Sequence, residues 1–447
     1  MNPQRPTHRV VIVGGGFGGL NLARRLARSP VDVVLIDRRN FHLFQPLLFQ
    51  VATGALSPAN IAAPLRSILR GQRNTAVRQG EVADIDVARR EVVLREGARV
   101  LYDTLVVASG VRHSYFGNDQ WEPNAPGLKS IEDATEIRRR VLSAFEAAEQ
   151  ESSPENRAAC LTFIIVGGGP TGVEMAGALA ELSRHTLEQE FRTIKTSEAR
   201  ILLVEGLDRV LPTYPPSLSQ KALKSLERLG VSVQLRTKII DVDAGGATIE
   251  TDSQREHIAA RTVIWAAGVQ ASPLGRAIAE KTKTELDRNG RLVVNSDLTV
   301  PGHPEIFVIG DLACFRQADG RPLPGVAPVA IQQGRFVARA IARRLRGQPV
   351  GSFRYRDMGN LATIGRSAAV ADFGWLRFSG FLAWFLWLVI HLMNLIMFQN
   401  RLLVLIQWAW NYFTYNRSAR LITGPTESFP PPAPAPSPND PQTRSSA

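Results

Sequence analysis

The stretch that decides the fold is VVIVGGGFGG, residues 10–19, where a short run of β-branched residues leads directly into a glycine loop. A continuously apolar run of this kind is typical of a central parallel strand that is covered on both faces. Leu20–Leu26 follows with apolar residues at helical spacing, and a second apolar run, Val31–Ile36, ends in Asp37. These residues predict a complete strand–turn–helix–strand unit.

The spacing Gly14-x-Gly16-x-x-Gly19 has a mechanical reason in such a unit. The first glycine makes the tight turn, the second lets the backbone approach a pyrophosphate, and the third lets the helix pack close to the strand. The helix N-terminus offers unpaired N–H groups and a positive dipole end to the phosphates. Asp37 stands where a ribose diol needs an acceptor. We therefore expect a dinucleotide site rather than a glycine turn without function.

The same pattern occurs a second time, about 150 residues further along the chain. A predicted strand, Leu161–Val166, leads into the loop Gly167–Gly172, and a helix is expected to begin at Val173. The next strand, Arg200–Val204, ends in Glu205. Two such units predict two dinucleotides, one a bound flavin and the other an exchangeable nicotinamide.

Glu205 indicates which nicotinamide cofactor is preferred. A carboxylate there accepts hydrogen bonds from a 2′-hydroxyl and repels a 2′-phosphate, which favours NADH over NADPH. Arg209, four residues later, would soften that preference. The 33 residues between Gly172 and Glu205 exceed the usual ~20, and we expect the excess to form an extended helix over Glu181–Ile194.

Further strands are predicted to end in turns that face the cofactors. These strands and turns are Leu105–Val107 before Ala108-Ser109-Gly110, Val263–Trp265 before Ala266-Ala267-Gly268, and Ile306–Ile309 before Gly310-Asp311. The first two turns are expected to mark crossings between cofactor domains. Asp311 is expected to meet the ribityl or pyrophosphate region of a flavin, or to cap a helix, or to do both.

Composition excludes several other classes of protein. The chain has 447 residues, enough for two or three domains, and 44% of them are hydrophobic. Its two cysteines, Cys160 and Cys314, are far apart, which excludes a disulfide scaffold, a zinc ribbon and a dithiol of neighbouring cysteines. The net charge is +12, but no basic run exceeds the three arginines at 138–140, so nucleic acid is disfavoured. No metal site is expected.

The C-terminal part is apolar and rich in tryptophan. Residues 378–400 carry no charge, and five of the seven tryptophans lie in this part of the chain. One helix over the apolar run 380–398 would measure about 28 Å, close to the ~30 Å hydrocarbon core. Because His391 and Asn394 interrupt the run and arginines flank it, a pair of interfacial helices is favoured over a spanning helix. A buried dimer interface or core helix is the third interpretation.

At this point the chain resembles type II NADH dehydrogenase, the single-subunit, non-pumping NADH:quinone oxidoreductase. The resemblance implies FAD in the first unit, NADH in the second, and a membrane quinone as the acceptor of two electrons from the flavin. The stretches that carry it are 11–20, 40–58 (with FHLFQPLLFQVATGALSP), 167–182 (GGGPTGVEMAGALAEL), 307–311, 326–334 (VAPVAIQQG) and 380–424.

The resemblance also assigns the cofactors to particular residues. Those assigned to FAD are Gly14, Gly16, Phe17, Gly18, Gly19, Asp37, Arg38, Gln45, Val82, Ser109, Gly110, Asp311 and Ala327. Those assigned to NADH are Gly167, Gly169, Pro170, Thr171, Gly172, Glu205, Ala267 and Gly268.

Three residues are candidates for catalysis by the same resemblance. Glu174 is similar to the family's glutamate beside the nicotinamide and the flavin, although an acid early in a helix also suits the helix dipole. The family's quinone motif, AQxAxQ, corresponds to Ala327–Gln332, with Pro328 in place of its first glutamine. Gln332 and Gln333 remain candidates for placing the quinone headgroup. The same stretch also reads as an ordinary helix start with proline in its first turn.

Related enzymes are less compatible with the sequence. Sulfide:quinone oxidoreductases share the fold but generally need a cysteine relay at the flavin, and disulfide reductases need a CxxxxC pair that this chain lacks. Two alternatives stay open: a flavin-dependent NAD(P)H reductase with a soluble acceptor, and a redox sensor that holds FAD and NADH without rapid turnover.

We therefore predict an α/β fold with two Rossmann-like dinucleotide-binding domains, the NADH domain inserted in the FAD domain, and a C-terminal apolar helical segment. The expected divisions are 8–118 and 287–345 for FAD, 158–275 for NADH, 346–373 for connecting strands near the flavin, 374–424 for membrane-associating helices, and 425–447 for a disordered proline-rich tail. The expected location is the cytoplasmic face of the cell membrane. The expected partners are NADH, a membrane quinone and the bilayer surface, and a homodimer also fits.

Overall fold

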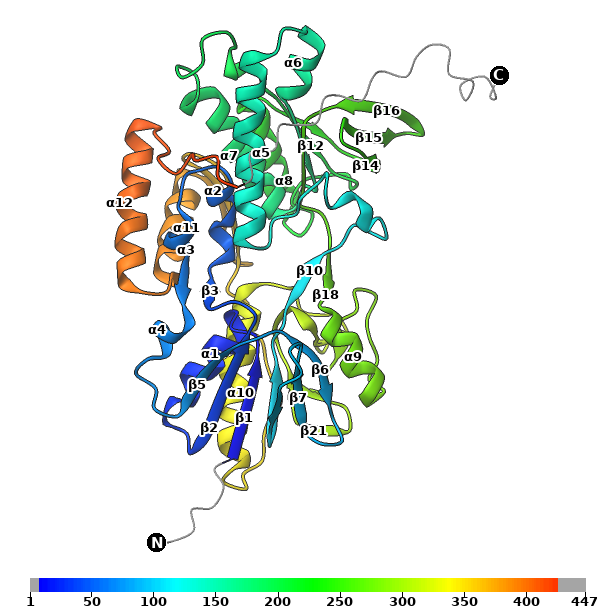
Figure 1. The fold of residues 1–447 in the computed structure, drawn as a ribbon, viewed down its shortest axis with the longest axis vertical. Coiled ribbons are helices and arrows are strands. Elements are labelled where there is room, and N and C mark those ends of the chain that lie inside the picture. Colours follow the sequence, from blue (N-terminus) through cyan, green and yellow to red (C-terminus); the bar gives the residue numbers. More distant parts are fainter. Residues whose placement is uncertain (1–7, 425–447) are drawn as a thin grey trace.

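The computed structural model describes residues 8–424, and its first body is built on a six-stranded sheet (Figure 1). The strand order is β20-β21-β9-β1-β2-β5, and every pair is parallel except β20 with β21. The bounds are β1 His8–Val13, β2 Val31–Asp37, β5 Thr75–Gln79, β9 Thr104–Val107, β20 Thr299–Val300 and β21 His303–Val308. Because β1 is central, its Val10, Val11 and Ile12 are completely buried.

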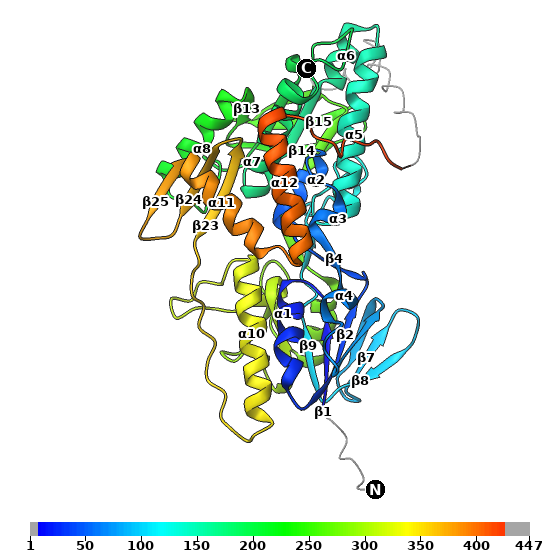
Figure 2. The same ribbon diagram turned by 90° about the vertical axis from the view of Figure 1, so that its left-hand side faces the viewer.

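Helices and a small meander complete this body. Helix α1, Phe17–Arg25, packs along the long helix α10, Ala327–Arg344, as both views show (Figure 2). A Cβ at Gly334 would overlap the carbonyl oxygen of Gly18, so the two helices approach at backbone distance. The antiparallel meander consists of β6 Val82–Asp86, β7 Glu91–Leu94 and β8 Arg99–Leu101. Its buried residues share a core with the six-stranded sheet.

The second body contains the parallel sheet β13-β12-β11-β17. Its strands are β11 Thr162–Val166, β12 Arg200–Val204, β13 Val231–Gln234 and β17 Thr262–Trp265. An antiparallel sheet shares a core with it and consists of β14 Thr237–Val242, β15 Gly246–Thr251 and β16 Gln254–Ala259. The helices of this body are α5 Ile131–Gln150, α6 Pro154–Cys160, α7 Pro170–Glu181 and α8 Pro216–Arg228. The two predicted strand–turn–helix–strand units are thus confirmed.

Two chain crossings join the bodies, where the sequence predicts them. Strand β10, Val111–His113, pairs antiparallel with β18, Val269–Ala271. The remaining short elements are β3 Phe41–Leu43, α2 Leu48–Ala52, α3 Pro58–Ile61, β4 Ala62–Pro64, α4 Leu65–Leu69, α9 Pro273–Thr282, β19 Leu292–Val293 and β22 Ala313–Cys314.

Three helix predictions differ from the structure. Helix α1 begins at Phe17 rather than Leu20, and α7 begins at Pro170 rather than Val173. In both, the glycine before the helix is the N-cap, and in α7 alone a proline occupies the first helical position, which it suits. The extended helix over 181–194 is wrong.

The chain after α7 folds back instead of continuing as a helix. Helix α7 ends at Glu181 and is followed by a π-helical turn, Leu182–Thr186. The carboxylate of Glu149 on α5 accepts the N–H groups of residues 192–194 at 2.8–3.2 Å. These bonds replace helical ones, so the excess length forms a loop against α5 rather than a longer helix.

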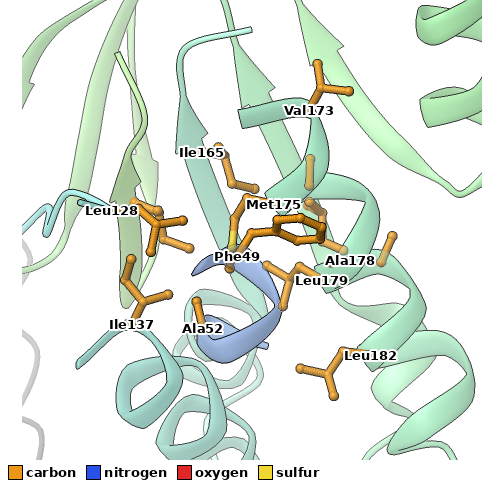
Figure 3. Packing of buried hydrophobic residues seen from close by; sticks show 14 of the residues in the cluster. Phe49, Ala52, Leu128, Ile137, Ile165, Val173, Met175, Ala178, Leu179 and Leu182 are labelled. Carbon is orange, nitrogen blue, oxygen red and sulfur yellow. The ribbon is translucent and has the colours of Figure 1, made fainter. Parts of the chain in front are cut away.

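Helix α2 carries residues of the first chain segment into the core of the second body. Figure 3 shows Phe49 lying among Met175, Ala178 and Leu179 of α7. Phe49 is 5% exposed, and its neighbours in α2 are buried in the same cluster. The two bodies therefore share one core here, although the sheet of each is separate.

The C-terminal part forms a small sheet and two helices. Strands β23 Asn360–Gly365, β24 Ala368–Asp372 and β25 Arg377–Gly380 form an antiparallel sheet. The helices are α11 Phe381–Asn394 and α12 Phe398–Thr414, which lie together on one side of the molecule (Figure 2). The favoured prediction of two helices is confirmed, and the alternative of one helix over the whole run 380–398 is wrong, because the chain breaks at Leu395–Met397, where Met397 has φ 72°. Within residues 8–424, no helix combines the length and apolarity needed to cross a membrane.

Two further expectations concern the ends of this part. The arginines expected at the helix ends mostly bond to protein: Arg417 is buried and pairs with Glu181 at 3.2 Å, and Arg420 pairs with Glu190. The predicted disordered tail, 425–447, lies outside the residues that the structure describes.

Candidate functional site

The first glycine turn has the geometry that its spacing predicts. Gly14 has φ +105°, and a Cβ there would overlap the carbonyl oxygen of Ala108. A Cβ on Gly19 would overlap the carbonyl oxygen of Gly14, so the helix touches the turn. Gly16 caps α1, and a Cβ on it would meet nothing within 4 Å. The open space thus lies beside unpaired helix N–H groups, where a pyrophosphate fits.

The second glycine turn reproduces the first one. Gly167 also has φ +105°, and a Cβ on it would lie 2.9 Å from Ala267 Cα. A Cβ on Gly172 would overlap the carbonyl oxygen of Gly167. Gly169 caps α7 and, like Gly16, has open space around its Cβ position. Pro170 and Thr171, the first residues of α7, are exposed beside it.

The acid after each second strand is fixed by its own glycine turn. Asp37 Oδ2 accepts the N–H of Gly15 at 2.6 Å, and Glu205 Oε2 accepts the N–H of Gly168 at 2.6 Å. The other carboxylate oxygens accept N–H groups two residues further along, at 2.8 Å in both cases. Burial raises the pKa of Asp37, against the opposing effect of these backbone bonds. An ionised carboxylate has about four acceptor positions, so each acid keeps capacity for ribose hydroxyls.

The carboxyl end of β21 brings Asp311 next to α10. Gly310–Leu312 forms one 3-10 turn, in which burial raises the pKa of Asp311. Gln333 Oε1 accepts the N–H of Gly310 at 2.6 Å. Gln333 Nε2 is buried and has no hydrogen-bond partner among the described residues. A buried amide with an unused N–H is costly unless a ligand pairs with it, so this corner fits a polar group of a flavin.

The other residues assigned to FAD surround the first turn. Ser109 Oγ lies 2.6 Å from Ser272 Oγ, and Gly110 follows with φ +69°. Gln45 Nε2 donates to the carbonyl oxygen of Lys129 at 3.1 Å. Arg38 is exposed, while Phe17, Val82 and Ala327 are half-buried. None of these positions conflicts with a flavin, and each residue's contact with it stays a prediction.

His42, which was not among the predicted site residues, holds the first glycine turn by a hydrogen bond to its backbone. His42 Nδ1 lies 2.9 Å from the carbonyl oxygen of Gly15, and because a carbonyl only accepts, this nitrogen carries the proton. Burial lowers the pKa of His42. Its ring meets Phe17 edge-on at 5.1 Å. Nothing in the sequence distinguishes His42 from an ordinary core histidine.

The two candidate glutamines of α10 differ in whether their side-chain amides already have hydrogen-bond partners in the protein. Gln332 bonds the backbone of Arg356 in both directions, donating from Nε2 at 2.8 Å and accepting at Oε1 at 3.0 Å. Its amide is thus used to hold the connecting segment. Gln333 keeps a free N–H and is the better candidate for contact with a bound group.

Glu174 lies on the side of α7 that faces the C-terminal sheet. It is in the second turn of the helix, because α7 starts at Pro170, and the N–H groups of the first turn are not beside it. Its Oε1 accepts the N–H of Thr363 at 3.3 Å. Burial raises the pKa of Glu174 to about 8, against the opposing effects of Thr363 and the Trp387 indole. The carboxyl group therefore holds its proton at neutral pH.

Helix α11 adds two side chains to this place that the sequence analysis did not assign. The rings of Trp387 and His391 stack at 4.3 Å, and His391 Nδ1 donates to the carbonyl oxygen of Trp387 at 2.7 Å. Burial lowers the pKa of His391 to about 4, so its ring is neutral. A lone histidine in an apolar run was the available signal, because polar residues in such runs often have a function.

The outward faces of α11 and α12 are apolar. The exposed side chains there are Phe381, Leu382, Phe385, Val389, Met393, Phe398, Leu402, Leu403, Leu405, Ile406, Trp410 and Phe413. We call this set the apolar face. The inward sides carry buried Ala383, Trp387 and Val404. Many exposed apolar side chains on two neighbouring helices indicate an interaction site.

Between residues 8 and 424 there is no group of three or more His, Cys, Asp or Glu side chains placed to hold a metal ion. Cys160 and Cys314 are both free and buried.

Comparisons with known proteins agree with this geometry. Residues 8–334 match the pyridine nucleotide-disulphide oxidoreductase family, and residues 358–415 match the NDH2 C-terminal domain. The chain is 47% identical over 437 residues to type II NADH:quinone oxidoreductase Ndh of Mycobacterium tuberculosis, covering 95% of this chain and 93% of that protein. It is 31% identical to the type II NADH:quinone oxidoreductase of Staphylococcus haemolyticus, over 80% of this chain and 87% of that protein.

Solved structures show the same fold. NDH2 from Plasmodium falciparum, solved in complex with NADH, superposes with a TM-score of 0.85 at 20% identity, covering 94% of this chain and 100% of that one. The sulfide:quinone oxidoreductase of Aquifex aeolicus superposes less well, with a TM-score of 0.66 at 16% identity over 93% of this chain and 92% of that one. The family matches and the extent of identity together place this chain in the family of type II NADH:quinone oxidoreductases.

Proposed function

We propose that this chain oxidises NADH at its second glycine turn and passes two electrons by way of FAD, held at its first, to a membrane quinone. The observation that carries the proposal is the duplicated nucleotide cradle, by which we mean each glycine turn with the acid bonded to it. The first glycines of the two turns, Gly14 and Gly167, have the same φ, and each turn donates an N–H to its own acid at 2.6 Å. The family membership supplies the identity of the two nucleotides. When bound, FAD supplies the two-electron chemistry that links a hydride donor to a quinone.

The chain's own residues bind and orient the reactants. Gly16 and Gly169 leave room for the pyrophosphates beside the N-termini of α1 and α7. Asp37 and Glu205 accept ribose hydroxyls, and the charge of Glu205 disfavours a 2′-phosphate. Gln333 has a free N–H at the Gly310-Asp311 turn that can bond to the flavin. Orientation of this kind is the main contribution of a protein to hydride transfer.

Glu174 is the proposed proton source for the quinone. Reducing a quinone by two electrons requires two protons, and a neutral carboxyl group in an apolar site can donate one. Glu174 is protonated at pH 7 because burial raises its pKa to about 8. Trp387 of α11 interacts with Glu174, and His391 stacks on Trp387; the same helix carries part of the apolar face. A lipophilic quinone could therefore approach Glu174 without leaving apolar surroundings.

A direct assay tests the function. The purified, detergent-solubilised protein should be yellow, lose its 450 nm absorbance on anaerobic addition of NADH, and regain it on addition of a soluble quinone. A reductase for a soluble protein acceptor would be bleached by NADH but reoxidised only slowly by any quinone. A redox sensor would bind both nucleotides and turn over negligibly. Either result would overturn the proposal.

We also propose that the apolar face lies in one leaflet of the cytoplasmic side of the cell membrane. The apolar face consists of exposed apolar side chains on two helices in contact with each other, and no acidic residue occurs between Asp372 and Glu427. The length of α11, 14 residues or about 21 Å, suits a helix lying in the interface. A homodimer that buries the same face is the competing occupant.

Charges on the apolar face should detach the protein from membranes. Leu402 and Ile406 are 47% and 58% exposed and lie one turn apart on α12. The double variant Leu402→Glu/Ile406→Glu lacks two of the apolar side chains that would enter the lipid and carries two negative charges in their place. We expect at least a tenfold fall in the fraction that floats with lipid vesicles. Turnover with NADH and a short-chain quinone should persist, since neither residue contacts the cradles.

The control is Leu101→Glu, at an exposed apolar position on β8 in the first body. It should float like the unchanged protein. Unaltered flotation of the double variant would contradict membrane attachment through α12. A double variant that converts a dimer to a monomer, while the unchanged protein does not bind vesicles, would assign the face to a second copy instead.

A further inference from the structure

Phe116 is an exposed aromatic residue held in a strained conformation. Its side chain is 68% exposed, and its φ is 54°, in the left-handed region that bulky residues rarely adopt. The next residue, Gly117, also has positive φ. Strain of this kind persists only where the surroundings enforce it, and it is frequent at ligand sites.

The ring of Phe116 lies against the end of β17 in the second cradle. A Cβ on Gly268 would lie 2.6 Å from Cζ of this ring, so the contact exists only because residue 268 is glycine. Gly268 itself has φ +70°. The neighbouring residue, Ala267, is the one on which Gly167 of the glycine turn packs. Phe116 thus borders the nucleotide cradle directly.

The sheet order shows which half of a dinucleotide would be near this ring. The order is β13-β12-β11-β17, so β12 and β17 lie on opposite sides of β11. The acid at the end of β12, Glu205, belongs to the adenosine ribose, and the turn after β11 belongs to the pyrophosphate. A dinucleotide laid across these strand ends has its nicotinamide half over the end of β17, where Gly268 and Phe116 lie.

The frame behind Phe116 is rigid. Trp265 Nε1 donates to the carbonyl oxygen of Ser114 at 2.9 Å, and the buried hydroxyl of Tyr115 donates to the carbonyl oxygen of Ala125 at 2.8 Å. The rings of Tyr115 and Trp265 lie 5.1 Å apart. Phe116 is therefore presented on a fixed support, with one edge on Gly268 and most of its surface open to solvent.

We propose that Phe116 is the aromatic wall of the NADH site on its nicotinamide side, and that it sets NADH affinity by packing against the nicotinamide riboside. The inference rests on the proposed function, since it takes NADH as the substrate of this cradle. Phe116 positions the substrate and takes no part in bond making. Its exposed ring would become buried on binding, which removes apolar surface from water and offers a flat partner to the ring or sugar.

A purely structural role would have a different signature. If Phe116 only shaped the 114–118 turn, removing the ring would change stability and leave nucleotide affinity unaltered. Glycine separates the two roles, because it adopts positive φ without strain. Phe116→Gly should therefore fold at least as well as the unchanged protein while lacking the ring.

The test uses the FAD-loaded protein in detergent and two readouts. In anaerobic stopped-flow, the dependence of flavin bleaching on NADH concentration gives an apparent Kd and a limiting rate. We expect Phe116→Ala and Phe116→Gly to raise that Kd about tenfold, with the limiting rate changed less than twofold. Titration calorimetry with NAD⁺ should show the same weakening independently of turnover. Phe116→Tyr should bind as the unchanged protein does, and so should Leu101→Ala, which removes an exposed apolar side chain elsewhere.

The outcomes are distinct. Unaltered Kd values for both nucleotides in Phe116→Gly would overturn the inference and leave the proposed function intact. A fall in the limiting rate with an unaltered Kd would also overturn it. If NADH failed to bleach the flavin of the unchanged protein, the proposed function would fail, and this inference with it.

Discussion

Replacing Gly19 by alanine should yield a protein without flavin, whereas replacing Gly172 by alanine should yield a yellow protein that NADH no longer reduces. In each case the added Cβ would overlap the carbonyl oxygen of the first glycine of the turn, Gly14 or Gly167. The helix and the turn must then separate. Separation moves the helix N-terminus away from the pyrophosphate. It also opens the hydrogen bond from Gly15 to Asp37, or from Gly168 to Glu205.

The expected effects are large because the overlap is with backbone. A side chain could rotate away, but a carbonyl oxygen in the turn can move only with the loop itself. We expect flavin content after reconstitution to fall more than tenfold in Gly19→Ala, and the apparent Kd for NADH to rise at least a hundredfold in Gly172→Ala. The ratio of absorbance at 450 nm to that at 280 nm measures the first, and anaerobic stopped-flow measures the second.

The two variants control for each other, since they carry the same chemical change in duplicate cradles. Gly71→Ala provides a further control, because a Cβ there meets nothing within 4 Å. It should bind FAD and NADH normally. A Gly172→Ala protein that loses its flavin but keeps NADH binding would show that the two cradles have been assigned the wrong way round.

Replacing Glu174 by glutamine should slow quinone reduction about a hundredfold, while flavin bleaching by NADH continues. Glutamine keeps the shape and the polar contact with the Thr363 N–H, but it cannot release a proton. Loss of a positioned general acid typically costs 10²–10⁴-fold. Anaerobic reduction of the flavin, followed by mixing with a soluble quinone, measures the affected half-reaction alone.

The pH profile distinguishes a proton donor from a structural residue. Burial raises the pKa of Glu174 to about 8, so the donating form predominates below that pH. Quinone reduction by the unchanged protein should fall as pH rises from about 7 to 9, and the Glu174→Gln profile should be flat there. Glu174→Asp should retain the pH dependence at a lower rate. An unchanged rate in Glu174→Gln would exclude this carboxyl group as the source of the proton.

Stability provides a second check on the same group. A carboxyl group whose folded pKa is raised from 4.5 stabilises the protonated folded state, so its contribution is complete below about pH 4.5. It is lost as pH rises through about 8, at up to ~1.4 kcal/mol for each pH unit. We expect Glu174→Gln to melt at a higher temperature than the unchanged protein at pH 8, and at a similar temperature near pH 4.5.

The parts of the fold that could be predicted are those where backbone geometry dictates the residue. Gly14 and Gly167 need positive φ, and Gly19 and Gly172 lie where no Cβ fits. Such positions accept almost no other residue, so they are visible in a single sequence. The apolar runs of the central strands are visible for the same reason, because a strand covered on both faces has no polar side.

The errors occurred where tertiary contacts override local preference. Residues 181–194 look helical, but the Glu149 carboxylate takes three of their N–H groups. Two C-terminal helices were predicted and are present, but the first ends before the apolar run 380–398 does, because the chain breaks at Leu395–Met397. Glu149 is 43 residues away from Arg192 along the chain, so this contact leaves no local signal in the sequence.

The candidate site divides in the same way. The glycines and the acids could be assigned from spacing. Trp387 reaches Glu174, and His391 stacks on Trp387, only because α11 packs on the C-terminal sheet that contacts α7. Phe116 stands in a turn with no motif, and its importance depends on touching Gly268. The sequence also could not show that Gln332 is engaged by the backbone of Arg356 while Gln333 is free.

The insertion of α2 into the second body limits how this enzyme can work. Swinging the bodies apart about the β10–β18 ribbon would withdraw Phe49 and its neighbours from their packing, at about 1.5–3 kcal/mol for each large side chain. Large hinge motions are therefore too costly to occur in every catalytic cycle. The distance between the two glycine turns therefore stays nearly constant, and NADH and quinone must enter and leave without the two bodies separating.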